Sequence, residues 1–380
     1  MAKNTELKIS KDMKTLNIES LKDNLLHYDY NTRYLLSLIK KGVPKDDPHF
    51  ISSFNGFRGE LFENITYELL LQYAIKNDQI TQFILKGPHQ NLKDANNAKF
   101  GLLMDRKQQI VYKAGYKDVS EYDAMFFCGN TLYFVECTIV VSTMGLRKRL
   151  RKKYALLSLL FPNHEIKALI ILSQGATGIH KFPDFATVWV TDTLDPTAIL
   201  DKIAQADNYK KEKLNRYNSN KLIQAHDVKV NHFKYFDTLG WIFRKALFKD
   251  TKMLNEKFLL SDKVNRYIEI FSKIYIGFIS YDTLVELVGK ENLDFEETNH
   301  VHVTIDKKDD GSYYVVFYTR VSKKRLTKIE ILDNGIKLSD KDPKGFTVAE
   351  TKFIDYIIKP FNKINLKQIK NIQKRVLSWK

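Results

Sequence analysis

Two short apolar runs, joined by Gly129-Asn130 and flanked by acids, constrain the fold of this 380-residue chain more than any other feature. The runs predict strands over Glu121 to Cys128 and Thr131 to Val140, because glycine and asparagine accept the positive φ of a tight hairpin turn. Antiparallel pairing across that turn places Asp123 and Glu136 at the same end of the hairpin. Two carboxylates held together repel each other unless a positive charge lies between them, and a divalent cation with oxygen ligands is the usual solution.

Segments on both sides of the hairpin alternate between helical and strand patterns. Apolar residues repeat near the helical period from Phe57 to Leu69 and predict one long helix. Short apolar runs further along the chain are typical of buried parallel strands. The expected elements are a helix over Phe54 to Lys76, a strand over Gln109 to Ala114, a helix over Met144 to Phe161, strands over Ala168 to Leu172 and Ala186 to Val190, and a helix over Pro196 to Ala206. This order predicts an α/β fold, with a mixed sheet of four or five strands flanked by helices.

The patterns divide the chain into three segments. Residues 1–50 are an expected N-terminal helical segment, residues 51–206 the α/β domain, and residues 207–380 a basic α+β domain. Within the first segment, Gly42 to Phe50 contains two prolines and predicts a loop. The C-terminal domain is expected to hold a helical block over Phe236 to Gly289, strands over His300 to Ile305, Ser312 to Val321 and Thr327 to Leu332, and helices over Val348 to Lys359 and Asn365 to Lys380.

A third acid, Glu63, lies on the long helix within the stretch Gly59-Glu60-Leu61-Phe62-Glu63. Together with Glu121-Tyr122-Asp123 and Glu136-Cys137-Thr138, this pattern resembles the PD-(D/E)XK nuclease superfamily. It is most similar to the nuclease domains of restriction-type proteins and of CRISPR ancillary effectors. In those domains the helix reads Gly-x-x-x-Glu, and the hairpin begins with Glu-x-Asp and ends with Glu-Cys-Lys. The resemblance covers about residues 54–195.

The resemblance implies a restriction-endonuclease-like fold and a metal-dependent endonuclease. It implies that Glu63, Asp123 and Glu136, together with the carbonyl of Cys137, hold Mg²⁺ or Mn²⁺. The metal would activate water for the hydrolysis of phosphodiester bonds, in DNA in preference to RNA. Restriction or anti-phage defence is the setting that the family suggests.

The chain departs from the family at one position, where Thr138 replaces the motif lysine. A hydroxyl cannot supply the positive charge that the lysine brings to the attacking water and the phosphate. One explanation is a lysine from a neighbouring element, and Lys148 and Lys152 on the following helix are the expected catalytic lysines. Lys113 and Lys117, on or near the first strand, are further candidates. The other explanation is a catalytically degenerate module that binds nucleic acid or a partner within a larger assembly.

The charge balance favours a polyanionic partner. The chain has 61 Lys and Arg against 45 Asp and Glu, a net charge of +16, and +11 of this excess lies in residues 201–380. Clustered cations gain free energy by displacing condensed counterions from phosphates. A/T-biased coding also produces Lys-rich chains, and it is the alternative origin of this charge.

Two basic segments are expected to contact nucleic acid, one on the helix after the hairpin and one on the last helix. The residues are Arg147, Lys148, Arg151 and Lys152, and then Lys367, Lys370 and Lys374. With Lys363, the second set recurs at intervals of four, three and four, so it forms one stripe along the helix. Ile364, Ile369, Ile372 and Val376 lie on other faces and are expected to dock this segment. The alternative for this half of the chain is a role in homodimerisation or in docking a partner subunit.

The sequence also makes predictions about the cellular setting. The chain has no run of 18 apolar residues, so no membrane-spanning helix is expected. Its N-terminus mixes Lys with Asp and Glu and lacks an apolar core, so no signal peptide is expected. Cys128 and Cys137 lie in apolar runs and are expected to be reduced, buried thiols of a cytoplasmic protein.

Overall fold

The computed structural model describes residues 21–90, 98–192, 195–204, 214–271, 273–298, 300–308, 310–321, 326–332, 335–341 and 362–379. Over these residues the chain is a mixed α/β protein with several sheets, so the expectation of helices combined with mixed sheets is confirmed. The chain forms two compact units, the first of residues 1–150 and 157–232 and the second of residues 151–156 and 233–380. None of the described helices combines the length and the apolar character needed to cross a membrane.

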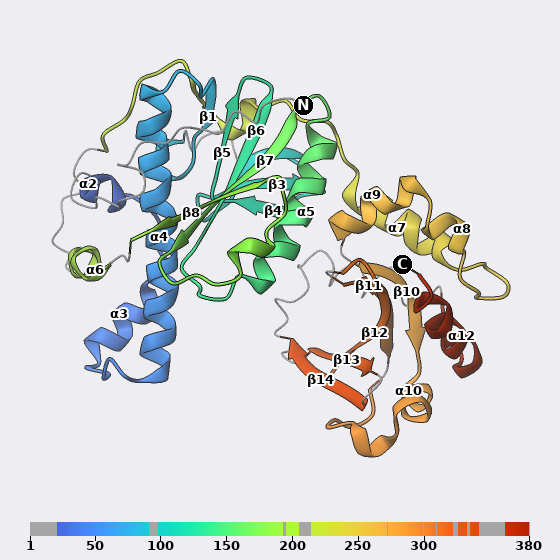
Figure 1. Cartoon of the computed structure of the whole chain (residues 1–380). Helices are drawn as coiled ribbons and strands as arrows, with labels where there is room; N and C mark the ends of the chain where they lie inside the picture. Colours follow the sequence, from blue (N-terminus) through green and yellow to red (C-terminus); the bar gives the residue numbers. More distant parts are fainter. Residues whose placement is uncertain are drawn as a thin grey trace. The chain divides into compact units, whose positions relative to one another are not determined.

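The first unit contains a six-stranded sheet, a three-stranded sheet and the helices that cover them (Figure 1). Its helices are α2 (Lys22–Leu25), α3 (Arg33–Lys40), α4 (Pro48–Lys76), α5 (Met144–Leu160) and α6 (Thr197–Ala204), with the 3₁₀ turns η1 (Gly87–His89), η2 (Ile179–Lys181) and η4 (Ala225–Asp227). Its strands are β1 (Gln82–Ile84), β2 (Gly101–Met104), β3 (Ile110–Ala114), β4 (Lys117–Tyr122), β5 (Ala124–Cys128), β6 (Thr131–Thr138), β7 (Glu165–Ser173), β8 (Ala186–Thr191) and β9 (Leu222–Ile223).

The six-stranded sheet has the strand order β8-β7-β6-β5-β1-β9. β5 and β6 form the expected hairpin, with Ala124 opposite Val135 and Cys128 opposite Thr131. β6, β7 and β8 are parallel, whereas β1 is antiparallel to β5 and parallel to β9. The sheet has more strands than expected because β1 and β9 are too short to produce a clear pattern. Since β9 belongs to this sheet, the first unit extends to His232, beyond the expected domain end at residue 206.

The long helix α4 begins at Pro48, six residues before the predicted start. Proline suits the first turn of a helix, because an N–H at that position has no partner within the helix. Asp47 caps the helix, and its Oδ1 accepts hydrogen bonds from the N–H groups of His49 and Phe50 at 2.8 and 3.3 Å. The expected loop over Gly42 to Phe50 is therefore wrong at its end, where the second proline starts the helix.

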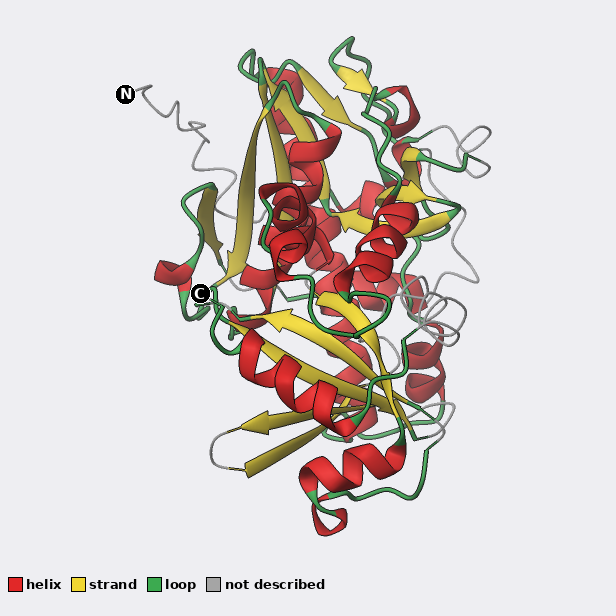
Figure 2. Ribbon diagram, turned by 90° about the vertical axis from the view of Figure 1, so that its right-hand side faces the viewer, coloured by secondary structure: helices red, strands yellow, loops and turns green. Residues whose placement is uncertain are grey.

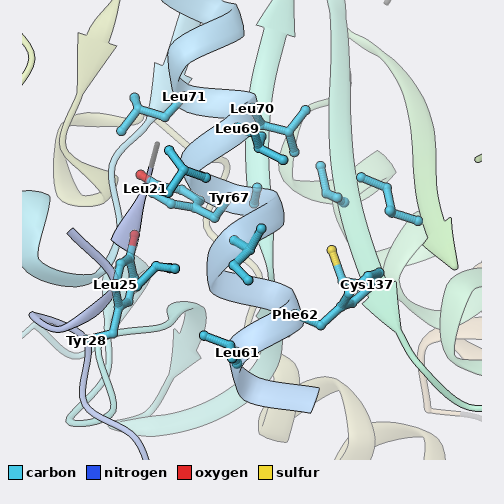
Figure 3. Packing of buried hydrophobic residues seen from close by; sticks show 14 of the residues in the cluster. Leu21, Leu25, Tyr28, Leu61, Phe62, Tyr67, Leu69, Leu70, Leu71 and Cys137 are labelled. Atoms are coloured by element: carbon cyan, nitrogen blue, oxygen red, sulfur yellow. The ribbon is translucent and has the colours of Figure 1, made fainter. Parts of the chain in front are cut away.

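Side chains of the hairpin alternate between the two faces of the large sheet. Cys137 points toward α4, where it joins Leu61 and Phe62 in one buried apolar cluster (Figure 3). Phe127 points to the other face, and its ring centroid lies 5.9 Å from that of Phe161, the residue that follows α5. α4 and α5 therefore cover opposite faces of this sheet, as Figure 1 shows.

The three-stranded sheet, β2-β3-β4, is antiparallel throughout. The sequence predicted one continuous strand across Asp123, because the apolar pattern continues on both sides of it. Pairing divides that strand instead. Tyr122 lies opposite Ile110 in the small sheet, and Ala124 lies opposite Val135 in the large one. Asp123 is thus the one residue between the two sheets.

The second unit contains a five-stranded antiparallel sheet in the order β10-β11-β12-β13-β14, with helices packed around it (Figure 2). Its helices are α7 (Tyr235–Ala246), α8 (Glu256–Leu259), α9 (Asp262–Phe271), α10 (Tyr281–Val288) and α12 (Leu366–Val376), with the 3₁₀ turn η5 (Lys290–Asn292). Its strands are β10 (Lys273–Ile279), β11 (Val301–Lys307), β12 (Tyr313–Arg320), β13 (Leu326–Leu332) and β14 (Gly335–Lys341).

The expected helical block over Phe236 to Gly289 is wrong at its centre, where β10 separates α9 from α10. The run Ile274-Tyr275-Ile276 is short and apolar, and such a run fits helix and strand periodicity equally well. The three expected strands of this unit are present, and β14 was not predicted. The helix expected over Val348 to Lys359 lies outside the described residues.

The last helix, α12, docks through the apolar residues that the sequence indicated. Ile369, Ile372 and Val376 are buried, and so is Ile364 before the helix. α12 packs against β12, and the ring centroids of Trp379 and its partner Tyr313 on that strand lie 5.6 Å apart. The basic stripe is exposed on the opposite side, at Lys363, Lys367, Lys370 and Lys374.

Candidate active site

Asp123 occupies the bend between β4 and β5, opposite Glu136 when the hairpin register is extended by one residue. Its side chain is buried, and its Oδ2 accepts a hydrogen bond from the N–H of Cys137 at 2.6 Å. A short bond of this kind to a carboxylate fixes the side chain against the end of β6. The structure therefore brings together the two acids that the hairpin pattern predicted.

Glu136 lies near the end of β6 and is 1% exposed. On the sheet face that α5 covers, the Nε atom of Arg149 lies 3.1 Å from Oε2 of Glu136. Burial of a carboxylate costs several kcal/mol unless a cation or hydrogen-bond donors compensate it. Arg149 is therefore a cation that the site itself provides. Arg149 belongs to the same basic segment of α5 as Lys148 and Arg151, but it is not among the residues that the sequence predicted for the site.

Glu63, on α4, has a carboxyl pKa well above its ordinary value. Burial is the largest cause, because it disfavours the charged form. The negative charges of Asp123, Glu121 and Glu136 raise the pKa further, and the positive charge of Lys86 opposes the rise. The other two acids of the predicted site, Asp123 and Glu136, therefore both act electrostatically on Glu63.

Lys86 is a fully buried lysine that belongs to this group. Its Nζ atom donates to Oε1 of Gln109 at 3.0 Å and lies 5.2 Å from the ring centroid of Tyr67. Its charge acts to lower the pKa of both Glu63 and Cys137. Lysines are almost never fully buried unless an opposite charge compensates them, and Glu63 is an acid on which the charge of Lys86 acts.

A cluster of buried polar side chains holds the segment that carries Lys86 against α4. Gly87 has a φ of 61°, a conformation that glycine adopts without steric cost. Nε2 of His89 lies 2.6 Å from Oε1 of the buried Glu68 on α4, and the Tyr28 hydroxyl donates to the same oxygen at 2.7 Å. Lys86 was not predicted as a site residue, although a lone lysine between an apolar run and a Gly-Pro pair was an available signal.

The lysines that the sequence favoured lie on α5 and β3. Lys148 is exposed on α5, and Lys152 is half-buried on the same helix. Lys113 on β3 forms an ion pair with an aspartate of β4, with 3.6 Å between Nζ and Oδ1. The lysine whose charge acts on Glu63 is Lys86 instead.

The basic run of α5 does not form one solvated face. Lys148 and Arg149 are exposed, whereas Arg147 and Arg151 are half-buried and Lys153 is buried. Among the predicted phosphate contacts on this helix, Lys148 is therefore the most accessible.

The residues of the site have the donor chemistry of a Mg²⁺ or Mn²⁺ centre. Carboxylate oxygens are the ligands that both ions prefer, and Glu63, Asp123 and Glu136 supply them. Their repulsion, expressed in the raised pKa of Glu63, is what a divalent cation relieves. Within the described ranges, no three acid, His or Cys side chains surround one point closely enough to hold a metal.

Burial also determines the chemistry of the two thiols. Cys137 has a thiol pKa well above its ordinary value, chiefly because of burial and then because of Asp123 and Glu63. Burial raises the pKa of Cys128 to about 11. Both thiols are therefore protonated at neutral pH, which makes them poor nucleophiles.

Comparison of the chain with models of protein families gave no match. Searches among curated proteins and among solved structures also gave none. The chemistry of the site therefore carries the functional argument.

Proposed function

We propose that this chain is a Mg²⁺- or Mn²⁺-dependent endonuclease of the PD-(D/E)XK type, with a restriction-endonuclease-like fold, that hydrolyses phosphodiester bonds of DNA. The observation that carries the proposal is the grouping of Glu63, Asp123 and Glu136 with the buried Lys86. Phosphodiester hydrolysis needs oxygen ligands for a divalent cation and a positive charge beside the reacting phosphate. This group of side chains can provide both.

In this proposal Lys86 takes the role that Thr138 cannot fill. The ammonium group is held by Gln109 and shielded from water, so its field acts on the phosphate with little screening. It would stabilise the charge that develops on the phosphate oxygens and orient the attacking water. A bound Mg²⁺ or Mn²⁺ would supply a Lewis acid and lower the pKa of that water. Glu63, with its raised pKa, would release its proton when the metal binds.

The proposal assigns the phosphate contacts to two exposed basic surfaces. On α5 these are Lys148 and Arg149, and on α12 they are Lys367, Lys370 and Lys374. Replacing the three α12 lysines with Glu should weaken DNA binding equally at all sequences and flatten its salt dependence. Unchanged affinity and salt dependence would instead support a dimerisation or partner-docking role for α12.

A cleavage assay tests the proposal. Plasmid DNA, single-stranded DNA and RNA are incubated with the protein in Mg²⁺, in Mn²⁺ and in EDTA. We expect metal-dependent cleavage of DNA, and a loss of at least about 100-fold in Asp123→Ala and in Glu136→Ala. Lys40→Gln, an exposed position on α3, is the matched surface control and should cleave normally. Cleavage that survives both alanine substitutions would place the activity elsewhere.

The contact between Arg149 and Glu136 favours a second candidate, a nuclease-like module without catalysis. In such a module the arginine permanently replaces the metal, and the basic surfaces hold nucleic acid or a partner within a larger assembly. This candidate predicts salt-sensitive binding without cleavage, no effect of Mg²⁺, and normal binding by Asp123→Ala. The same incubations distinguish the two candidates, since only the nuclease responds to the metal. Restriction or anti-phage defence is the proposed setting for the active form.

A further inference from the structure

The tip of the β3–β4 hairpin presents an exposed aromatic ring. Gly115 and Tyr116 form the turn, with φ values of 57° and 66°. Two successive positive φ angles are the mark of a type I′ turn, whose second central position favours glycine. Here that position is occupied by tyrosine, and its side chain is 64% exposed.

The positive φ of Tyr116 has a steric cost, and the packing of its side chain does not offset this cost. Three non-glycine residues among those described have positive φ, namely Gln108, Tyr116 and Lys252. A bulky residue in this region is strained, and such strain is found chiefly where the side chain has a function. Most of the ring of Tyr116 faces solvent, so the ring does not stabilise the core.

A basic side chain lies beside this ring. The main-chain N–H of Tyr116 donates to the carbonyl of Lys99 at 3.1 Å, so the turn is fixed against the segment before β2. The Nζ atom of Lys99 lies 6.0 Å from the ring centroid of Tyr116 and 5.4 Å from that of Phe100. Lys117 directly follows the ring in the chain. An exposed ring with cations beside it matches a nucleotide, which combines a flat base with a phosphate.

We propose that Tyr116 is a stacking platform for an unpaired base of a bound nucleic-acid strand, with Lys99 and Lys117 contacting the phosphates next to it. The inference rests on the proposed nucleic-acid function and adds a second contact point to it. β4 runs from this platform directly to Asp123. At about 3.3 Å per residue, the ring lies roughly 20 Å from the candidate active site. The platform would therefore grip a strand several nucleotides away from the bond that is cut.

A fluorescent oligonucleotide tests the proposal. The probe is a 20-nucleotide single-stranded DNA with one 2-aminopurine, whose fluorescence falls when the base stacks on an aromatic ring. We expect wild-type protein and Tyr116→Phe to bind it with the same affinity and to quench it. Tyr116→Gly should bind about tenfold more weakly without quenching, because one base–ring stack is lost. Its melting temperature should equal or exceed that of the wild type, because glycine relieves the positive φ.

Tyr34→Ala is the matched control, since Tyr34 is also exposed, at 54%, but lies on α3. It should leave both affinity and quenching unchanged. If Tyr116→Gly binds and quenches as the wild type does, the stacking platform is disproved while the proposed nuclease function stands. That result would leave the hairpin tip as a surface for a protein partner. If the wild-type protein does not bind the probe or its duplex at any salt concentration, the proposed function fails as well.

Discussion

The guanidinium of Arg149 lies against the carboxylate of Glu136, with 3.1 Å between Nε and Oε2. The carboxylate is buried, whereas about half of the arginine side chain is exposed. In the proposed nuclease, Glu136 is a metal ligand, so Arg149 and the metal compete for the same carboxylate.

This competition predicts that Arg149→Gln binds Mn²⁺ several-fold more tightly than the wild type. The same substitution should lower the free energy of unfolding of the metal-free protein by about 1–2 kcal/mol, because the buried carboxylate loses a cation that is itself half exposed. Titration calorimetry and urea denaturation in EDTA measure the two effects. Lys148→Gln, at the neighbouring exposed position, should change neither. Equal Mn²⁺ affinity in Arg149→Gln and wild type would show that the arginine does not compete.

Glu63 should give the metal-free protein a defined pH dependence. Its carboxyl pKa in the folded state lies well above the ordinary value of 4.5, so the folded state binds more protons than the unfolded chain between the two values. The free energy of unfolding contributed by this group therefore falls as the pH rises from about 4.5 through the folded pKa. Urea denaturation in EDTA at successive pH values should show a smaller decline in Glu63→Gln. Identical profiles would mean that Glu63 is not the group responsible.

The cysteines should be unreactive in the folded protein. With a pKa of about 11, Cys128 is about 0.1% thiolate at pH 8, and burial and nearby acids also raise the pKa of Cys137 well above its ordinary value. A thiol reagent such as Ellman's should therefore label neither residue at pH 8 within minutes, and should label both in urea. Rapid labelling of Cys137 in the native protein would show that the site is more open than described.

Two glycines with nearly equal φ offer a test of the segment that holds Lys86. Gly87 has a φ of 61°, and a Cβ built there would lie 2.5 Å from Cε1 of Tyr28. Gly129 in the β5–β6 turn has a φ of 55° and nothing within 4 Å of such a Cβ. Gly129→Ala should cost about 1 kcal/mol from the backbone alone, and Gly87→Ala about 2–4 kcal/mol because the ring must also move. Equal losses in chemical denaturation would show that Tyr28 does not hold this segment.

Much of the fold could be predicted from local patterns. The apolar stripe of α4, the Gly129-Asn130 turn and the docking face of α12 all appear where the sequence indicated them. Each of these features depends on residues that are close together in the chain, so a local pattern is enough to predict it. The break at Asp123 could not be predicted in this way. It depends on which partner strand each side pairs with, and that is a long-range choice. The strand β10 was not predicted for a related reason, because its short apolar run fits the periodicity of a helix as well as that of a strand.

The sequence predicted the acidic residues of the candidate site but not the basic residues that act on them. Asp123 and Glu136 are linked by a hairpin register that the sequence determines. Lys86 is 37 residues before Asp123 in the chain and reaches the acids only because β1 pairs with β5. Arg149 was one of several basic residues in the same run. Which of them faces Glu136 depends on how α5 is rotated about its axis against the sheet. Charge partners of this kind come from tertiary structure, which local spacing does not reveal.

Single-turnover cleavage by Lys86 variants tests whether the buried lysine takes part in phosphodiester hydrolysis. A fluorescently labelled linear DNA is mixed with excess wild type, Lys86→Gln or Lys86→Arg in Mn²⁺, and its affinity is measured in parallel in Ca²⁺. We expect Lys86→Gln to cleave at least about 100-fold more slowly while it binds DNA with wild-type affinity, and Lys86→Arg to be intermediate. Circular dichroism verifies that both variants are folded. A folded Lys86→Gln that cleaves at the wild-type rate would contradict the account, because the buried lysine would then have no part in the reaction.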